Sequence, residues 1–130
     1  MNTYGRLPLQ FASGDGVWLT DDQGARYLDG ISGIGVNALG HAHPAVTEAI
    51  QNQAGELLHT SNLYGVAKQS ALADKLCAAS GMSNVFFSNS GAEANEAAIK
   101  LARLHGHKKG ITTPNIIVMD AAFHGRTLAT

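Results

Sequence analysis

The chain has 130 residues, of which 45% are hydrophobic and 15% are charged, and its formal net charge is −1. This length is enough for one domain with a core, and the near-neutral charge favours neither a nucleic-acid partner nor a membrane surface. Cys77 is the only cysteine, so no disulfide can form within the chain. No signal peptide or membrane-spanning run is visible, and we expect a cytoplasmic protein.

The first part of the chain predicts an extended segment followed by a β-hairpin. Residues 1–12 show little periodicity, whereas the next segments alternate strand formers with turn formers. The predicted pieces are a turn at 14–16, strands at 17–20 and 25–29, and a turn between the strands at 21–24. Four glycines between residues 30 and 40 then indicate either a backbone that needs unusual freedom or the close approach of another group.

Two helices are predicted next. His43 precedes the first, Pro44 can occupy its first turn, and apolar residues at helical spacing continue to about Leu58. The second helix covers residues 67–79 and ends at Gly81. A polar loop at residues 59–66 joins them.

Residues 84–100 predict a strand, a tight turn and a third helix. The apolar run at 85–87 forms the strand, and Ser90 and Glu93 have the spacing of a capping box, so the helix should start at Ser90 and stop near Gly106. The first amides of a helix have no partner inside it and carry positive potential. Gly91 and Ala92 therefore suit a phosphate, with the Ser90 hydroxyl beside them. The alternative is that Ser90 only caps the helix and that nothing binds there.

A second buried-type strand is predicted at residues 116–119, which gives the second half an α/β pattern with a parallel sheet. Because two parallel strands cannot form a stable sheet that is covered on both faces, we expect the opening part of a longer protein. Phe123 and Arg126 follow this strand, at the sheet edge where ligands collect. An aromatic face can stack on a planar cofactor and a guanidinium can bind a carboxylate, although a core phenylalanine and a surface ion pair are the alternatives.

These motifs together resemble one family. Ser-Asn-Ser-Gly-Ala-Glu-Ala-Asn-Glu-Ala-Ala-Ile-Lys at 88–100, followed by Phe-His-Gly-Arg-Thr at 123–127, is similar to the class III pyridoxal-phosphate aminotransferases. Tyr-Leu-Asp at 27–29 and Gly-His-Ala-His-Pro at 40–44 extend the resemblance over nearly the whole chain. Within the class, Tyr-Gly-Arg-Leu-Pro at 4–8 and His-Thr-Ser-Asn-Leu-Tyr at 59–64 look most like acetylornithine aminotransferases of arginine biosynthesis.

The resemblance implies the N-terminal part of a fold type I enzyme, a homodimer that uses pyridoxal phosphate. It implies an incomplete parallel-type sheet layer with helices, preceded by an N-terminal hairpin segment. Residues 1–43 would belong to the small domain, and residues 67–130 would begin the large cofactor-binding domain. Residues 44–66 would form a helix and loop that link these two parts. The implied reaction transfers the terminal amino group of N-acetylornithine to 2-oxoglutarate, which gives glutamate.

The resemblance also implies roles for residues that match the family motifs. Gly91 and Ala92 would donate backbone hydrogen bonds to the cofactor phosphate, with Ser90 beside them. Phe123 would stack on the pyridine ring of the cofactor. Arg126 would hold the α-carboxylate of the substrate, and Tyr4 would face the substrate. The role of His124 stays open.

No catalytic residue is expected within this chain. The Schiff-base lysine and the acidic partner of the pyridine nitrogen lie later in such chains, and none of the five lysines matches the lysine motif. They are Lys68, Lys75, Lys100, Lys108 and Lys109. The chain alone should therefore not transaminate.

Several alternatives stay open from the sequence. The amino donor could be succinylornithine, succinyldiaminopimelate, ornithine or 4-aminobutyrate, although Gly33 lies where ornithine enzymes are expected to have a tyrosine. Asp120 after the second strand could indicate a dinucleotide-binding domain, but residues 88–94 have one glycine where that fingerprint needs three. A non-catalytic dimerising fragment is a third reading. His41 and His43 are too few ligands for zinc, so no metal site is expected.

Overall fold

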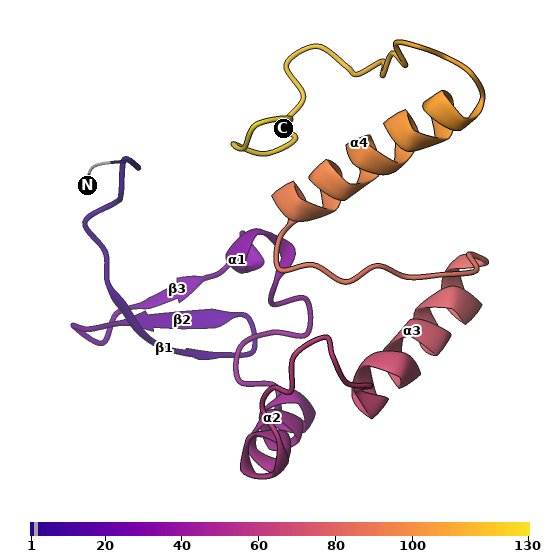
Figure 1. Cartoon of the computed structure of the whole chain (residues 1–130). Coiled ribbons are helices and arrows are strands. Elements are labelled where there is room, and N and C mark those ends of the chain that lie inside the picture. Colours follow the sequence, from indigo (N-terminus) through magenta and orange to yellow (C-terminus); the bar gives the residue numbers. More distant parts are fainter. Residues whose placement is uncertain (2) are drawn as a thin grey trace. The chain divides into compact units, whose positions relative to one another are not determined.

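The computed structural model describes Met1 and residues 3–130, which form two compact units, Met1–Tyr64 and Gly65–Thr130. Among these described residues, the first unit contains three strands and two helical segments, and the second contains two longer helices (Figure 1). In chain order the elements are β1 (Phe11–Asp15), β2 (Trp18–Asp21), β3 (Arg26–Leu28), α1 (Ser32–Gly35), α2 (Pro44–Glu56), α3 (Ala67–Ser80) and α4 (Gly91–Lys108). The predicted division at residues 43 and 66 into parts of two domains stays a prediction.

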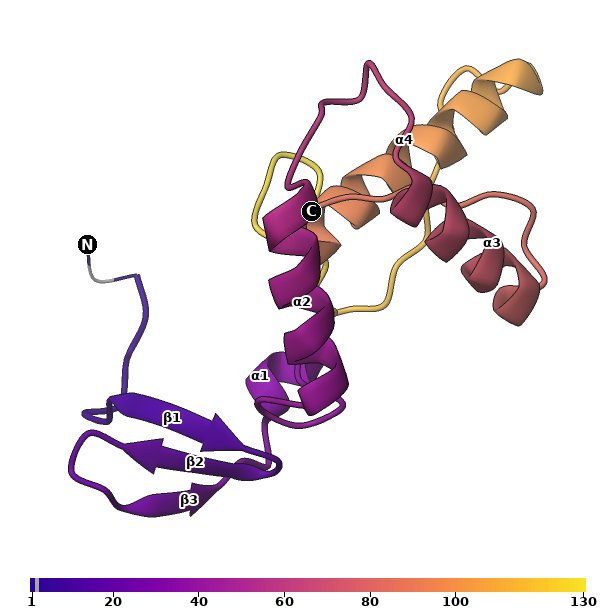
Figure 2. The same ribbon diagram turned by 90° about the horizontal axis from the view of Figure 1, so that it is seen from below.

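The three strands form one antiparallel sheet in the order β1-β2-β3 (Figure 2). The predicted hairpin is confirmed as β2 and β3, in which Trp18 pairs with Leu28. The predicted turn at 14–16 is wrong, because Gly14 and Asp15 belong to β1, a strand that was not foreseen. The chain instead reverses at residues 16 and 17, where Gly16 has a φ of 54° that suits a tight hairpin turn.

Asp21 stabilises the turn between β2 and β3. Its side chain is 7% exposed and accepts hydrogen bonds from the amides of Gln23 (3.0 Å) and Ala25 (2.7 Å). The Tyr27 hydroxyl donates to the other carboxylate oxygen at 3.0 Å. Burial alone raises the pKa of Asp21, but these hydrogen bonds outweigh it and hold the pKa below its usual value. The predicted turn at 21–24 is thus confirmed, with Asp21 itself in the strand.

The glycine-rich segment forms an unusual left-handed turn. Ser32, Gly33, Ile34 and Gly35, the residues of α1, have consecutive φ values of 54°, 61°, 60° and 78°. Left-handed backbone costs L-residues other than glycine roughly 1–2 kcal/mol each. Two glycines lower that cost, so the expected need for backbone freedom is confirmed here.

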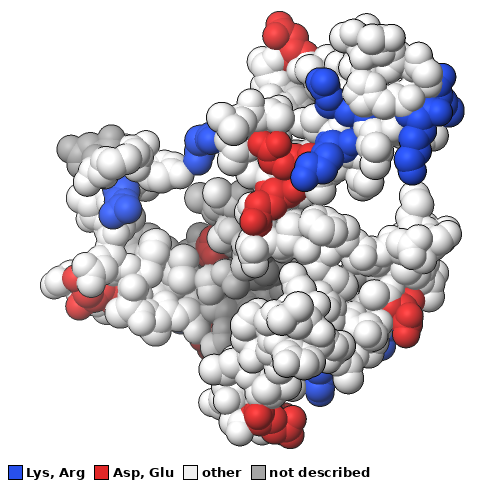
Figure 3. Space-filling model, viewed as in Figure 1, with Lys and Arg blue, Asp and Glu red and all other residues white. Residues whose placement is uncertain are grey.

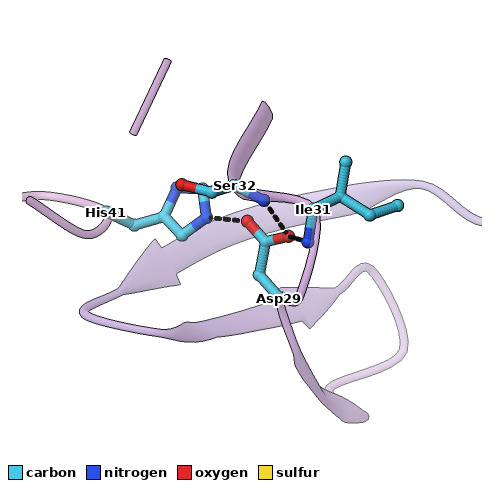
Figure 4. A network of polar contacts seen from close by, with 4 residues as sticks. All are labelled: Asp29, Ile31, Ser32 and His41. Atoms are coloured by element: carbon cyan, nitrogen blue, oxygen red, sulfur yellow. Dashed lines mark hydrogen bonds and ion pairs between the residues drawn. The ribbon is translucent and has the colours of Figure 1, made fainter. Parts of the chain in front are cut away.

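Asp29 fixes the entry to this turn (Figure 4). One of its carboxylate oxygens accepts hydrogen bonds from the amides of Ile31 (3.0 Å) and Ser32 (2.8 Å), and the other lies 2.7 Å from Nε2 of His41. The hydrogen bond with His41, followed by that from the Ser32 amide, lowers the pKa of Asp29. The network therefore joins the end of β3 to the segment that precedes α2.

Gly40 shows the second expected reason for glycine in this segment, a close approach of backbone. Its φ is +88°, and a Cβ atom placed there would lie 2.9 Å from the carbonyl oxygen of Gly16. The closeness arises because Gly16 and His41 exchange two backbone hydrogen bonds, at 3.0 and 2.7 Å. A side chain at residue 40 would push against this bridge.

Helices α2 and α3 follow the sequence closely. α2 begins at Pro44 directly after His43 and ends at Glu56, close to the predicted limit. α3 ends at Gly81, whose φ of 73° gives the left-handed cap that glycine favours. None of the helices in the described part of the chain is long and apolar enough to cross a membrane.

The predicted stop of α4 at Gly106 is wrong. The helix continues to Lys108, and the turn that ends it contains Gly110 at a φ of +79°. Amides of Gly110 and Ile111 donate to the carbonyls of His107 (2.9 Å) and Gly106 (3.1 Å), which is the Schellman arrangement. Gly106 is instead buried inside the helix, where a Cβ atom would lie 2.7 Å from the Pro114 ring.

The predicted parallel sheet layer is not formed in this structure. Residues 85–87 and 116–119 pair with no other strand, and the sheet of β1 to β3 is the only one in the described part of the chain. A strand is defined by a hydrogen-bonded neighbour, and an apolar run supplies only the side chains. Much apolar surface is exposed as a result, because none of the described hydrophobic side chains is buried and Ile117 is 96% exposed. Figure 3 shows that charged residues are sparse on the face in view, where uncharged residues, apolar and polar together, make up most of the surface.

Candidate functional site

The start of α4 carries the predicted capping box in a modified form. The Ser90 hydroxyl accepts a hydrogen bond from the Glu93 amide at 3.2 Å, as the motif requires. The Glu93 carboxylate reaches one residue further back than expected and accepts from the amide of Asn89 at 2.7 Å. The predicted helix start is confirmed, since Ser90 caps the helix and Gly91 is its first residue.

A pocket of about 360 Å³ opens beside this helix start. It is lined by Gly91, Ala92, Asn95 and residues 123–127. Four of the predicted site residues therefore come together, namely Gly91, Ala92, Phe123 and Arg126. His124, for which the sequence indicated no role, lies in the same lining.

The groups around this pocket suit an anion attached to a planar ring. The amides of Gly91 and Ala92 have no acceptor inside α4, and a Cβ atom at Gly91 would meet nothing within 4 Å. The Phe123 ring is 74% exposed, and the guanidinium carbon of Arg126 lies 5.3 Å from its centre, a cation–π distance. The pocket thus combines a positive helix end, an aromatic face and a guanidinium, so its residues fit pyridoxal phosphate.

Two predicted site residues are not in the lining. Ser90 lies next to it as the helix cap. Tyr4 belongs to the first compact unit and is 61% exposed, and its role stays a prediction.

Among the described residues, no group of three or more histidine, cysteine or acidic side chains is placed to hold a metal ion. His41 instead bonds to Asp29, and His43 precedes α2.

Sequence reasoning gave no role to Asn95 and Thr127, which line the pocket, or to Glu96, which bonds to the loop after Arg126. Asn95 donates from its side-chain amide to the His124 carbonyl at 2.7 Å. Glu96 accepts one hydrogen bond from the Thr127 hydroxyl and a second, at 3.1 Å, from the Ala129 amide. For Asn95 the sequence contained one signal. Asn95 is four positions after Gly91, and residues at that spacing lie on the same face of a helix.

Comparison with known proteins now decides the family. The family model described as Aminotransferase class-III matches residues 2–130. The chain belongs to the class III aminotransferases. Membership replaces the dinucleotide-binding alternative, for which the glycine fingerprint was already incomplete.

Three individual aminotransferases show how far the likeness extends. The acetylornithine aminotransferase of Nitrosomonas europaea is 60% identical over all of this chain, which spans 33% of that protein. The crystal structure of N-acetylornithine aminotransferase from Stenotrophomonas maltophilia is 41% identical, with a TM-score of 0.78 over 82% of this chain and 30% of that one. The taurine:2-oxoglutarate aminotransferase from Bifidobacterium kashiwanohense, solved in complex with PLP and glutamate, is 33% identical, with a TM-score of 0.75 over 80% of this chain and 25% of that one.

Proposed function

We propose that this chain is the N-terminal part of an acetylornithine aminotransferase. The whole enzyme transfers the terminal amino group of N-acetylornithine to 2-oxoglutarate by means of pyridoxal phosphate, a step of arginine biosynthesis. The observation that carries the proposal is the pocket in which the start of α4 meets Phe123 and Arg126. The 60% identity to an acetylornithine aminotransferase supports this amino donor over the others.

Each residue of the pocket has a distinct task in this proposal. Pyridoxal phosphate, when bound, supplies the electron sink that amino-group transfer needs. The amides of Gly91 and Ala92 bind its phosphate, with the Ser90 hydroxyl beside them, because the helix end offers unpaired donors and positive potential. Phe123 supports the ring, and the Arg126 fork binds the α-carboxylate of the amino acid.

The remaining parts of the proposal concern the whole protein. It is a cytoplasmic homodimer of fold type I, in which residues 85–87 and 116–119 join a parallel sheet, and Tyr4 faces the substrate. No residue of this chain is assigned a catalytic step, and the chain alone is inactive. The antiparallel sheet of β1 to β3 belongs to the small domain.

Substitutions at residue 90 can test the phosphate site, because one of them keeps the helix cap but changes the charge beside the phosphate. In the complete enzyme, Ser90→Asp keeps a good helix cap but places a carboxylate beside the phosphate. We expect its affinity for pyridoxal phosphate to fall at least about tenfold, equivalent to about 1.4 kcal/mol, while thermal stability of the cofactor-free protein stays near wild type. Ser90→Ala loses the cap and costs about 1 kcal/mol of stability instead.

The measurement is a cofactor titration followed by absorbance, alongside thermal unfolding. Ser70→Asp is the matched control, because it makes the same change in the first turn of α3. If Ser90→Asp binds the cofactor as tightly as wild type, the phosphate lies elsewhere and the site is wrongly assigned.

The amino donor can be tested by steady-state kinetics on the complete enzyme. We expect kcat/KM for N-acetylornithine to exceed that for ornithine by about tenfold or more, because Gly33 lacks the side chain that ornithine enzymes are expected to carry there. N-succinylornithine, succinyldiaminopimelate and 4-aminobutyrate complete the series, with 2-oxoglutarate as acceptor throughout. A higher efficiency with any of the other four donors contradicts the assignment while leaving the transaminase proposal intact.

A further inference from the structure

The loop that carries Phe123 and Arg126 is held to α4 at three points. Before Arg126, the Asn95 side chain donates to the carbonyl of His124 at 2.7 Å. After Arg126, Glu96 accepts from the Thr127 hydroxyl and from the Ala129 amide at 3.1 Å. The partners are 29 to 33 positions apart in sequence, so the contacts are long-range. They enclose the segment of Gly125 and Arg126 on both sides.

Close packing supports the same attachment. Gly125 has a φ of +146°, and a Cβ atom placed there would meet the Thr130 side chain first and would then lie 3.0 Å from the Cβ atom of Ala92. The loop backbone at Gly125 is therefore close both to Thr130 and to the first turn of α4. The hydroxyls of Thr127 and Thr130 lie 2.7 Å apart, and since Thr127 donates to Glu96, Thr130 donates to Thr127.

The charge of Glu96 is also set by this loop. The Thr127 hydroxyl, followed by the Ala129 amide, lowers the pKa of Glu96 below its usual value of 4.5. At pH values above its usual pKa, a carboxylate whose pKa is lowered in the folded protein stabilises the folded contact. That contribution is lost as the pH falls through the lowered pKa. At neutral pH Glu96 is therefore a charged acceptor, and hydrogen bonds to charged groups are the stronger kind.

We propose that Asn95 and Glu96 are positioning residues, which fix Arg126 relative to the first amides of α4. The inference rests on the proposed function in one respect, namely that Arg126 binds the substrate carboxylate. Gly91 and Ala92 lie on the same helix as the two positioning residues. α4 thus sets the distance between the phosphate site and the carboxylate site, since a side chain must be held by its surroundings to bind in one geometry.

Amide hydrogen exchange in the complete protein without cofactor tests the attachment directly. Glu96→Ala removes both acceptor contacts, and we expect exchange in residues 124–129 to become about tenfold faster or more. Glu96→Gln keeps an acceptor of the same size and should restore most of the protection. Arg103→Gln changes a charge on an exposed part of α4 and serves as the control. Unchanged exchange in Glu96→Ala would overturn the proposal whether or not the protein transaminates.

Kinetics then separate positioning from a merely structural role. With N-acetylornithine, Glu96→Ala and Asn95→Ala should raise KM about tenfold, with cofactor affinity changed less than threefold. In an Arg126→Lys background the same substitutions should have little further effect, because residues that act through one another are not additive. Additive losses, or equal losses of cofactor affinity and kcat, would show that the two residues support the fold only. A wild-type enzyme that does not transaminate would refute the proposed function alone, since the exchange result stands by itself.

Discussion

Replacing Arg126 by lysine in the complete enzyme is expected to lower kcat/KM for the amino-acid substrate roughly ten- to a hundredfold. A guanidinium binds a carboxylate through two parallel hydrogen bonds, whereas an ammonium acts as a point charge. Loss of a charge-assisted contact of this kind costs on the order of 1.5–3 kcal/mol, and about 1.4 kcal/mol corresponds to one decade. Lysine retains the positive charge near the Phe123 ring, so the variant isolates the contribution of the fork.

The control for this experiment is the neighbouring aromatic residue. Phe123→Ala should weaken cofactor binding first, whereas Phe123→Tyr keeps the ring face and should bind the cofactor nearly as wild type. Steady-state kinetics for both substrates, with a cofactor titration of each variant, distinguish the two patterns. If Arg126→Lys loses cofactor but keeps its apparent substrate affinity, Arg126 belongs to the phosphate site instead.

A second large effect is expected at Gly40, where alanine should destabilise the protein. An L-residue at a φ of +88° is strained, and its Cβ atom would lie 2.9 Å from the Gly16 carbonyl oxygen. Strain of this kind costs about 1–3 kcal/mol, and the backbone must also move to relieve the contact. The movement would weaken the two hydrogen bonds between Gly16 and His41.

Thermal unfolding and amide exchange of Gly40→Ala measure the two consequences together. The unfolding midpoint should fall, and the amides of Gly16 and His41 should exchange faster. Gly55→Ala is the matched control, because Gly55 lies in α2, where a Cβ atom would meet nothing within 4 Å. Alanine there should not destabilise the helix, since glycine is the poorer helix former. Equal stability of Gly40→Ala and wild type would contradict the predicted strain.

Elements that depend on neighbouring residues were predictable from the sequence, whereas those that depend on distant partners were not. Pro44 and Gly81 mark the start of α2 and the end of α3 because each residue restricts or permits its own backbone. β1 was missed because Phe-Ala-Ser-Gly-Asp is a weak strand sequence that is held by its pairing with β2. Gly106 was misread for the same reason, since the ring of Pro114 explains a glycine within the helix.

The candidate site divides in the same way. The capping box at Ser90 and the loop at 123–127 are local motifs, and both are recognisable from the sequence alone. Asn95 and Glu96 have ordinary helix positions, and their contacts with the loop lie about thirty positions away. Only the folded chain brings them to His124, Thr127 and Ala129. The position of Tyr4 relative to the pocket depends on the arrangement of the two units, which no local pattern encodes.

The turn at residues 32–35 has a consequence for the handedness of the amino acids that it can hold. Four successive positive φ values describe a short helix of the hand that D-amino acids prefer. At Gly33 and Gly35 the natural residue has no handedness, so a D-alanine introduced by chemical synthesis or ligation would occupy its own favoured backbone region. L-alanine at the same two positions would be the strained isomer. D-alanine at these two positions would thus stabilise the turn, whose entry the hydrogen bonds of Asp29 fix in the natural chain.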